Sequence, residues 1–210
     1  QLLHGQRAFT EWFGRPCSGA FLPDDFGYPA SLPQLVRRAG GSWFFTQKLS
    51  WNETNRFPHH TFWWEGIDGS RVLTHFSPAD TYNALLAPGE LRAAARRFAE
   101  HAGASSSLVC FGHGDGGGGP TEAMLQRARL AANWEGVPPV RIGSAEGFFA
   151  ETLAEYGERA PVWVGELYLE KHRGTYSTQV RTKQGNRRAE QLLHEVELWS
   201  ATCGVRPSEP

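Results

Sequence analysis

The sequence predicts an α/β protein, because short apolar runs of strand length alternate with longer segments of helical periodicity. AFL at residues 20–22 and SWFFTQ at 42–47 have the size and composition of buried strands. GELRAAARRFAEHAG at 89–103 has the spacing of an amphipathic helix. Asp68-Gly69 joins two apolar runs and is a hairpin signal. Alternating strands and helices imply a mainly parallel sheet with helical crossovers.

The other elements follow from periodicity and capping signals. Ser31 and Thr121 are expected N-caps, and Gly14 is an expected helix stop. We expect helices over residues 2–14, 32–40, 89–103, 121–134 and 144–157, and strands over 20–22, 42–47, 59–66, 70–76, 106–112 and 139–144.

The pattern changes after about residue 160. Residues 162–170 are extended in pattern, and 182–204 has the periodicity of one long helix. We therefore expect an α/β portion over residues 1–160, then a linker and the start of a helical domain over 161–210.

Composition excludes several classes of protein. The chain has 210 residues, 40% hydrophobic and 20% charged, and a formal net charge of −1. It therefore lacks the basic field that binding to nucleic acid or an anionic membrane requires, and no apolar run is long enough to span a bilayer. The three widely spaced cysteines indicate reduced thiols in an intracellular protein. Because the chain opens at Gln1 without Met, we expect a fragment of a longer chain.

Polar side chains follow the predicted strands where each strand ends. Ligand sites in parallel α/β folds form at the carboxyl ends of strands. Acids, a cation, a phenol and an imidazole therefore gather at one predicted rim: Asp24, Asp25, Lys48, Asp80, Tyr82, Asn83, His113 and Asp115. This set contains the groups that general acid–base and nucleophilic catalysis use.

Each of these signals has a simpler interpretation. Asp24 or Asp25 would also serve to bond a loop amide. Neighbouring residues His59 and His60 point to opposite faces of a strand, which favours a structural role over a shared metal. The run GDGGGG is no P-loop, because no Lys-Ser/Thr follows it. We interpret it as a tight loop that leaves room for a substrate beside Asp115.

Four segments together resemble glycoside hydrolase family 38, in particular its cytosolic and bacterial α-mannosidases. They are LPDDFGYPASLPQ, FFTQKLSWNETNRFPHHTFWWEGIDGSRVLTHF, GDGGGGPT and GELYLEKHRGTYSTQ, which occur in the family's order. The resemblance implies a retaining, zinc-dependent α-mannosidase with a seven-stranded parallel (β/α) barrel followed by a three-helix bundle. Residues 1–160 would then be the C-terminal part of the barrel, and 161–210 the linker and the start of the bundle.

The resemblance also implies roles for single residues. Asp24 matches the family nucleophile, which also ligates zinc, and Asp25 occupies a variable position beside it. Asp115 matches the candidate general acid/base. His172 matches a zinc ligand of the family, although a lone His is more often structural.

Four further positions are implied to contact the substrate. Lys48 falls where relatives carry a basic residue near the substrate. Tyr82 and Asn83 match a Tyr-Asp pair, from which Asn83 departs. Tyr176 lies in the polar string after the zinc His and completes the implied substrate-binding set.

One departure from the family pattern is large. The other two zinc ligands of the family lie on a His-x-Asp motif that this sequence lacks. We therefore expect both ligands upstream of residue 1, and we expect the isolated 210 residues to be inactive and poorly soluble. The parent is implied to be cytoplasmic and homo-oligomeric and to act on α-mannoside oligosaccharides, without nucleic acid or membrane. Two alternatives stay open: a metal-dependent carbohydrate deacetylase, and a carbohydrate-binding relative without activity.

Overall fold

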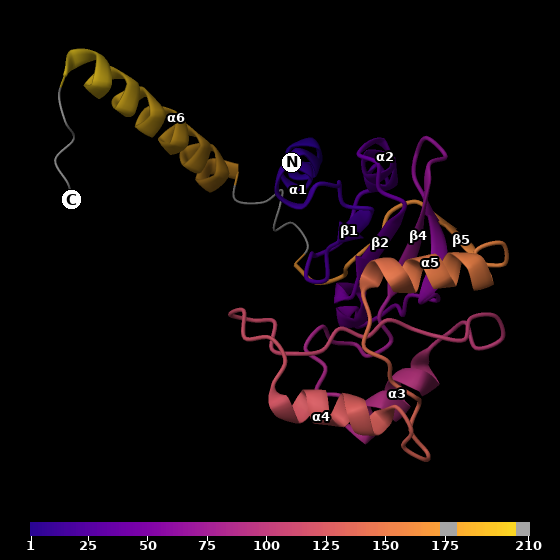
Figure 1. Ribbon diagram of the computed structural model, residues 1–210. Helices are drawn as coiled ribbons and strands as arrows, with labels where there is room; N and C mark the ends of the chain where they lie inside the picture. Colours follow the sequence, from indigo (N-terminus) through magenta and orange to yellow (C-terminus); the bar gives the residue numbers. More distant parts are fainter. Residues whose placement is uncertain (173–179, 205–210) are drawn as a thin grey trace. The chain divides into compact units, whose positions relative to one another are not determined.

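The computed structural model describes residues 1–172 and 180–204 (Figure 1). The chain divides into two compact units, residues 1–171 and 172–210, and each is described by itself. The predicted division at residues 160 and 161 stays a prediction.

The first unit is built on a mixed sheet of five strands in the order β1-β2-β4-β3-β5. The pairs β1–β2, β2–β4 and β3–β5 are parallel, whereas β3 and β4 form the antiparallel hairpin predicted at Asp68-Gly69. The strands are β1 (Gly19–Phe21), β2 (Trp43–Thr46), β3 (Thr61–Glu65), β4 (Arg71–Phe76) and β5 (Val162–Val164). The α/β class is thus confirmed, with a mixed sheet where a mainly parallel one was predicted.

The first unit also contains five α-helices: α1 (Leu2–Phe13), α2 (Leu32–Arg38), α3 (Pro88–Arg97), α4 (Glu122–Ala131) and α5 (Ala145–Tyr156), all within the predicted ranges or one residue beyond them. Gly14 ends α1 with a φ of 74°, and the Thr121 hydroxyl accepts the Met124 N–H at the start of α4. Ser31 is the N-cap residue of α2, as predicted, but its side chain makes no cap hydrogen bond. Pro33 occupies the first turn of α2 and removes one of the N–H groups that a cap would satisfy.

Helix α3 is shorter than predicted and ends at Arg97. The chain leaves the helix at Phe98, whose ring packs with Tyr156 and Ala160 in a small buried cluster. The carboxylate of Glu100 then turns inward and accepts the backbone N–H groups of His60 and Thr61. These contacts explain why the amphipathic pattern does not continue as helix to residue 103.

The strands predicted over 106–112 and 139–144 were wrong. Within the first of these segments, only Phe111 forms a β-bridge, with Ala84. The Leu108 N–H is donated to the ring of His75 instead of to a neighbouring strand. The apolar side chains of this segment still pack in two different clusters, which is why its sequence looks like a buried strand.

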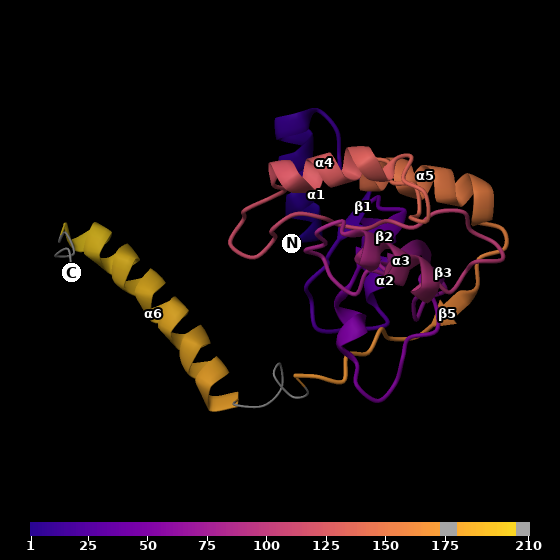
Figure 2. The same ribbon diagram turned by 90° about the horizontal axis from the view of Figure 1, so that it is seen from below.

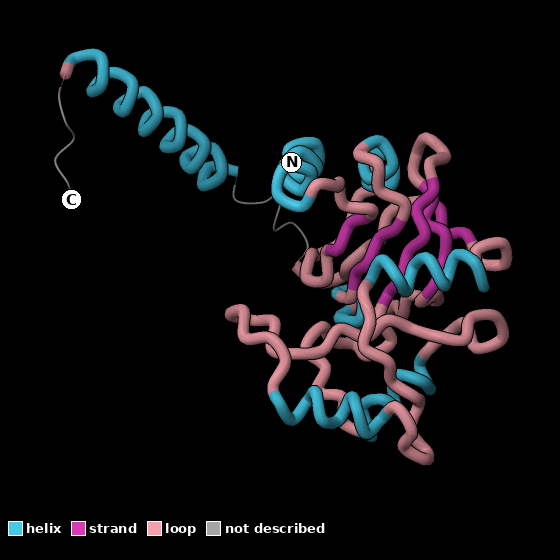
Figure 3. The backbone as a smooth tube through the Cα atoms, viewed as in Figure 1, coloured by secondary structure: helices cyan, strands magenta, loops and turns pink. Residues whose placement is uncertain are grey.

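Strand β2 is the centre of the core. All four of its residues are buried, and the alternation of a strand sends them to opposite faces. Phe44 packs on one face with Trp64 and other apolar residues, including Val36 of α2. Trp43 and Phe45 pack on the other face against α5 (Figures 1 and 2). β2 is therefore covered on both faces. In Figure 3 the strands (magenta) continue into loops (pink) at their ends.

Two buried histidines belong to the fold. The ring of His75 accepts the Leu108 N–H at Nε2, so its Nδ1–H is donated to the hydroxyl of Thr61. Nδ1 of His60 accepts the Ala99 N–H. Burial lowers the pKa of His60 to about 4 and that of His75 to about 3, so both rings are neutral. His59 lies against Glu100.

These pKa values predict loss of stability in mild acid. Below the ordinary histidine pKa of 6.5 the unfolded chain binds protons that the folded chain does not, so the free energy of unfolding falls as the pH falls. The slope is about 1.4 kcal/mol per pH unit for each histidine. We expect the denaturant midpoint of this domain in the full-length protein, followed by tryptophan fluorescence, to fall between pH 6.5 and 4.5. His75→Gln is expected to make that slope shallower, and an unchanged slope would contradict the assignment.

The second unit contains the predicted long helix, α6 (Val180–Cys203). Leu192, Val196 and Trp199 recur at helical spacing and are exposed in this unit. Among the described residues, no helix is both long enough and apolar enough to cross a membrane.

Candidate active site

Asp24 sits in a tight turn directly after β1. Gly27 has a φ of +100°, and a side chain there would meet the backbone of Leu167 and Leu169 at 3.2 Å. The buried phenol of Tyr28 donates to the Leu22 carbonyl at 2.6 Å, and its oxygen lies 2.8 Å from the Thr46 hydroxyl. Burial raises the pKa of Tyr28, so the phenol stays neutral. Through the contact of Tyr28 with Thr46, the turn that carries Asp24 is therefore anchored to β2.

Lys48 is the closest charged partner of Asp24. Its Nζ lies 2.5 Å from Asp24 Oδ1, and its side chain is only 3% exposed, whereas that of Asp24 is 51% exposed. The ammonium also lies over the ring of Trp51, 3.3 Å from the centroid, and 5.4 Å from the ring centroids of Phe26 and Tyr82. Removing the Lys48 ammonium from water costs free energy. The contacts with these aromatic rings offset part of that cost, and the ion pair with the Asp24 carboxylate offsets the remainder.

Tyr82 lies near the charges of both Asp24 and Asp115. Its hydroxyl donates to Asp115 Oδ1 at 3.2 Å. Burial, followed by the negative charges of Asp24 and Asp115, raises the pKa of Tyr82 to about 12. The structure therefore brings together two carboxylates that are 91 positions apart in the sequence, with a neutral phenol between them.

The glycine-rich run forms a tight hairpin, as expected. The backbones of His113 and Gly119 exchange two hydrogen bonds, of 2.8 and 2.7 Å. Gly116, Gly117 and Gly119 have φ between 68° and 76°, which glycine adopts without strain. Asp115 is exposed on this hairpin.

Asn83 and Asp25 occupy the edges of the cluster. Asn83 Oδ1 accepts the Gly114 N–H at 2.6 Å, so this side chain is directed at the hairpin. Asp25 is exposed, and partial burial followed by the charge of Asp24 raises its pKa. Asp24, Lys48, Tyr82, Asn83 and Asp115 are thus brought together.

The segment that leads to His172 is tied to the loop after Trp51. The carboxylate of Glu170 accepts the backbone N–H groups of Glu53, Thr54 and Asn55 at 2.7 to 2.8 Å. These bonds lower its pKa to about 2. His172 itself belongs to the second unit, and Tyr176 lies outside the described residues.

The described residues do not form a metal site by themselves. No group of three or more His, Cys, Asp or Glu side chains that would hold an ion is present in ranges 1–172 and 180–204. One oxygen of Asp24 is paired with Lys48. A catalytic zinc ion takes about three protein ligands, so Asp24 and His172 would need partners from outside these residues.

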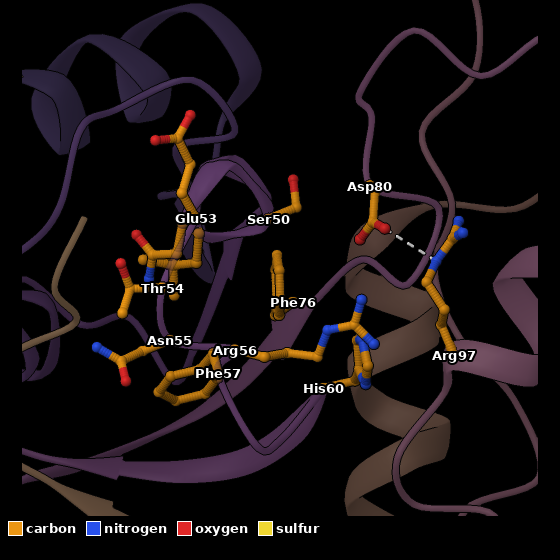
Figure 4. A pocket seen from close by; sticks show the side chains of 12 residues that line it. Ser50, Glu53, Thr54, Asn55, Arg56, Phe57, His60, Phe76, Asp80 and Arg97 are labelled. Carbon is orange, nitrogen blue, oxygen red and sulfur yellow. Dashed lines mark ion pairs between the residues drawn. The ribbon is translucent and has the colours of Figure 1, made fainter. Parts of the chain in front are cut away.

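A pocket of about 290 Å³ shares the 3₁₀ helix η1 (Lys48–Trp51) with the cluster (Figure 4). Asp80, predicted at the rim, lines this pocket and forms an ion pair with Arg97 at 2.9 Å. Its backbone has a φ of 58°. No sequence pattern indicated that Arg97, on α3, would reach this strand end.

The aromatic residues of the region divide between core and site. Trp64 is fully buried in the core. Trp51 is 42% exposed beside Lys48. Phe26, which the sequence did not single out, completes the enclosure of Lys48 from the Asp24 turn.

Comparison with known proteins gives consistent matches. The family profile described as "Glycosyl hydrolases family 38 N-terminal domain" matches residues 1–166. Alpha-mannosidase 2C1 of Homo sapiens is 46% identical over 209 residues, covering 100% of this chain and 20% of the relative. Alpha-mannosidase G of Dictyostelium discoideum is 47% identical over 203 residues, covering 97% of this chain and 19% of the relative. The chain thus spans about one fifth of the length of these curated relatives.

A solved structure agrees with the fold. The crystal structure of an alpha-mannosidase from Enterococcus faecalis V583 matches with a TM-score of 0.61 and 18% identity, covering 79% of this chain and 19% of that chain. This likeness shows that the chain shares its fold with part of that structure. The chain belongs to glycosyl hydrolase family 38, within its N-terminal domain.

Proposed function

We propose that this chain is part of the catalytic domain of a retaining α-mannosidase that removes terminal α-linked mannose from oligosaccharides. The observation that carries the proposal is that two carboxylates lie near one phenol, Tyr82, whose hydroxyl donates to Asp115 and whose pKa is raised by burial and by the charges of Asp24 and Asp115. Retaining glycosidases use two carboxyl groups about 5 Å apart, one as nucleophile and one as acid/base. The choice of mannose as the sugar is supported by the relatives, which are named alpha-mannosidases.

In this mechanism Asp24 attacks the anomeric carbon and forms a covalent mannosyl-aspartate. The bond to the leaving oxygen breaks as Asp115 donates a proton to that oxygen. Asp115 then takes a proton from water, which attacks the anomeric carbon and frees Asp24 with net retention. Lys48 holds one Asp24 oxygen in place throughout.

The substrate sits over the exposed edge of this cluster in our proposal. In this proposal Lys48, Tyr82 and Tyr176 contact sugar hydroxyls. Asn83 lies on the side of the substrate that faces the glycine-rich hairpin. The exposed part of Trp51 offers an apolar surface on which a sugar ring packs.

Zinc, the barrel and the second domain are the remaining parts of the proposal. Zinc would bind vicinal hydroxyls of the sugar and orient it, with Asp24 and His172 as two of its ligands and two more from outside this chain. Residues 1–160 would contribute to a seven-stranded barrel, and 161–210 would be the linker and start of a three-helix bundle. On this account the isolated 210 residues are inactive, and the full-length protein is a cytoplasmic homo-oligomer.

The proposed activity is tested by assaying the full-length protein on an aryl α-mannoside and on an acetylated sugar. We expect release of mannose and no release of acetate. Incubation with a chelator should abolish mannose release, and added Zn²⁺ should restore it. Acetate release would indicate a deacetylase, and binding of mannosides without turnover would indicate a carbohydrate-binding relative. Either result would overturn the proposal.

A further inference from the structure

Three consecutive residues, Tyr82, Asn83 and Ala84, contact the glycine-rich hairpin in order. The backbone of Ala84 accepts the Gly112 N–H and donates to the Cys110 carbonyl, each at 3.2 Å. Asn83 Oδ1 accepts the N–H of Gly114, and the hydroxyl of Tyr82 reaches Asp115. The segment after β4 therefore follows the hairpin residue by residue up to the proposed acid/base.

The hairpin has few other means of fixing its direction. Its internal bonds join His113 to Gly119 and Gly117 to Gly114, and these close the loop on itself. Apart from each glycine's own chain neighbours, no atom of the described residues lies within 4 Å of where a side chain would begin at Gly116, Gly117 or Gly119. The direction of the tip thus depends on contacts to the 82–84 segment.

The contact at Gly114 is the closest of them. A Cβ at this position would meet Asn83 Oδ1 at 2.6 Å and the Tyr82 ring at 3.3 Å, so a side chain at residue 114 would displace the Asn83 amide. The Asn83 N–H is itself donated to the Thr81 hydroxyl at 3.0 Å, which fixes the residue from its own side. Gly114, whose N–H is donated to Asn83, immediately precedes Asp115.

From this geometry we propose that Asn83 is a positioning residue, whose amide oxygen holds the Gly114 peptide so that Asp115 stays beside Tyr82 and Asp24. The inference rests on the proposed function, because it gives Asn83 a role through the acid/base and not through the sugar. Loss of the oxygen would misplace Asp115, and small misplacements of a catalytic group are costly in rate. An aspartate at this position would keep an acceptor for the same N–H.

The test uses the full-length protein and aryl α-mannosides whose leaving groups differ in pKa. Asn83→Ala is expected to lower kcat/KM at least about tenfold for poor leaving groups, which need protonation, and much less for activated ones. Asn83→Asp should restore most of the loss. Gly114→Ala should show the same dependence on the leaving group, because its methyl group displaces the Asn83 oxygen. Asn133→Ala, an exposed asparagine after α4, is the control and should change nothing.

The combination with Asp115→Ala decides how Asn83 acts. If Asn83 works through Asp115, the double variant is no slower than Asp115→Ala alone. Fully additive losses, or a uniform rise in KM for every leaving group, would overturn the proposal and make Asn83 a substrate contact. The acid/base assignment is judged separately, by the leaving-group dependence of Asp115→Ala by itself.

Discussion

Asp24→Asn in the full-length protein is expected to lower kcat for aryl α-mannosides by at least about a thousandfold, the scale seen when a nucleophile is removed. An amide has nearly the shape of the carboxylate but does not attack the anomeric carbon. Because the Asp24 side chain is 51% exposed and lies in a turn held by Tyr28, the fold should persist. Circular dichroism and the denaturation midpoint check this.

Asp25→Asn is the matched control for this substitution. It changes the same functional group one position along the same turn, and the side chain is exposed. We expect kcat to be almost unchanged. A kcat of Asp24→Asn within about tenfold of the parent enzyme would remove Asp24 as the nucleophile.

Asp115→Ala is expected to produce the second largest loss, and one that depends on the leaving group. Substrates with poor leaving groups need a proton on the departing oxygen, so their kcat/KM should fall by about 10²- to 10⁴-fold. Activated aryl mannosides leave without protonation and should lose far less in the glycosylation step. Initial rates over a series of leaving groups measure the difference.

Equal losses on both kinds of substrate would move the acid/base role to another residue. Tyr82→Phe is an informative companion, because it removes the hydroxyl bonded to Asp115 and leaves the ring near Lys48 in place. Its effect should lie between those of Asn133→Ala and Asp115→Ala.

The core was predictable from the sequence because its signals are local. The run Trp43 to Thr46 is apolar enough to demand burial on both faces, and it forms the central strand. The turn at Asp68-Gly69 sets the β3–β4 hairpin by its own backbone preference. Residues 106–112 carry the same kind of signal but lack a neighbouring strand to complete a ladder, which no local pattern reveals.

The candidate site was predictable in its residues but not in its contacts. Polar side chains at strand ends indicated Asp24, Lys48, Tyr82 and Asp115. The burial of Lys48 against Trp51 depends on how a 3₁₀ turn follows β2. The contact between Asn83 and Gly114 depends on two irregular segments lying side by side, and their conformations arise from the packing of the whole unit.

The most direct measurement of the central claim is to trap the covalent intermediate on the full-length enzyme. A fluorinated mannosyl donor with an activated leaving group forms the glycosyl-enzyme but slows its hydrolysis, so the adduct accumulates and can be mapped by mass spectrometry of peptides. We predict one mannosyl adduct per chain, located on Asp24. An adduct on Asp25 or Asp115, or no adduct together with a product of inverted configuration, would contradict the assignment of Asp24 as the nucleophile of a retaining α-mannosidase.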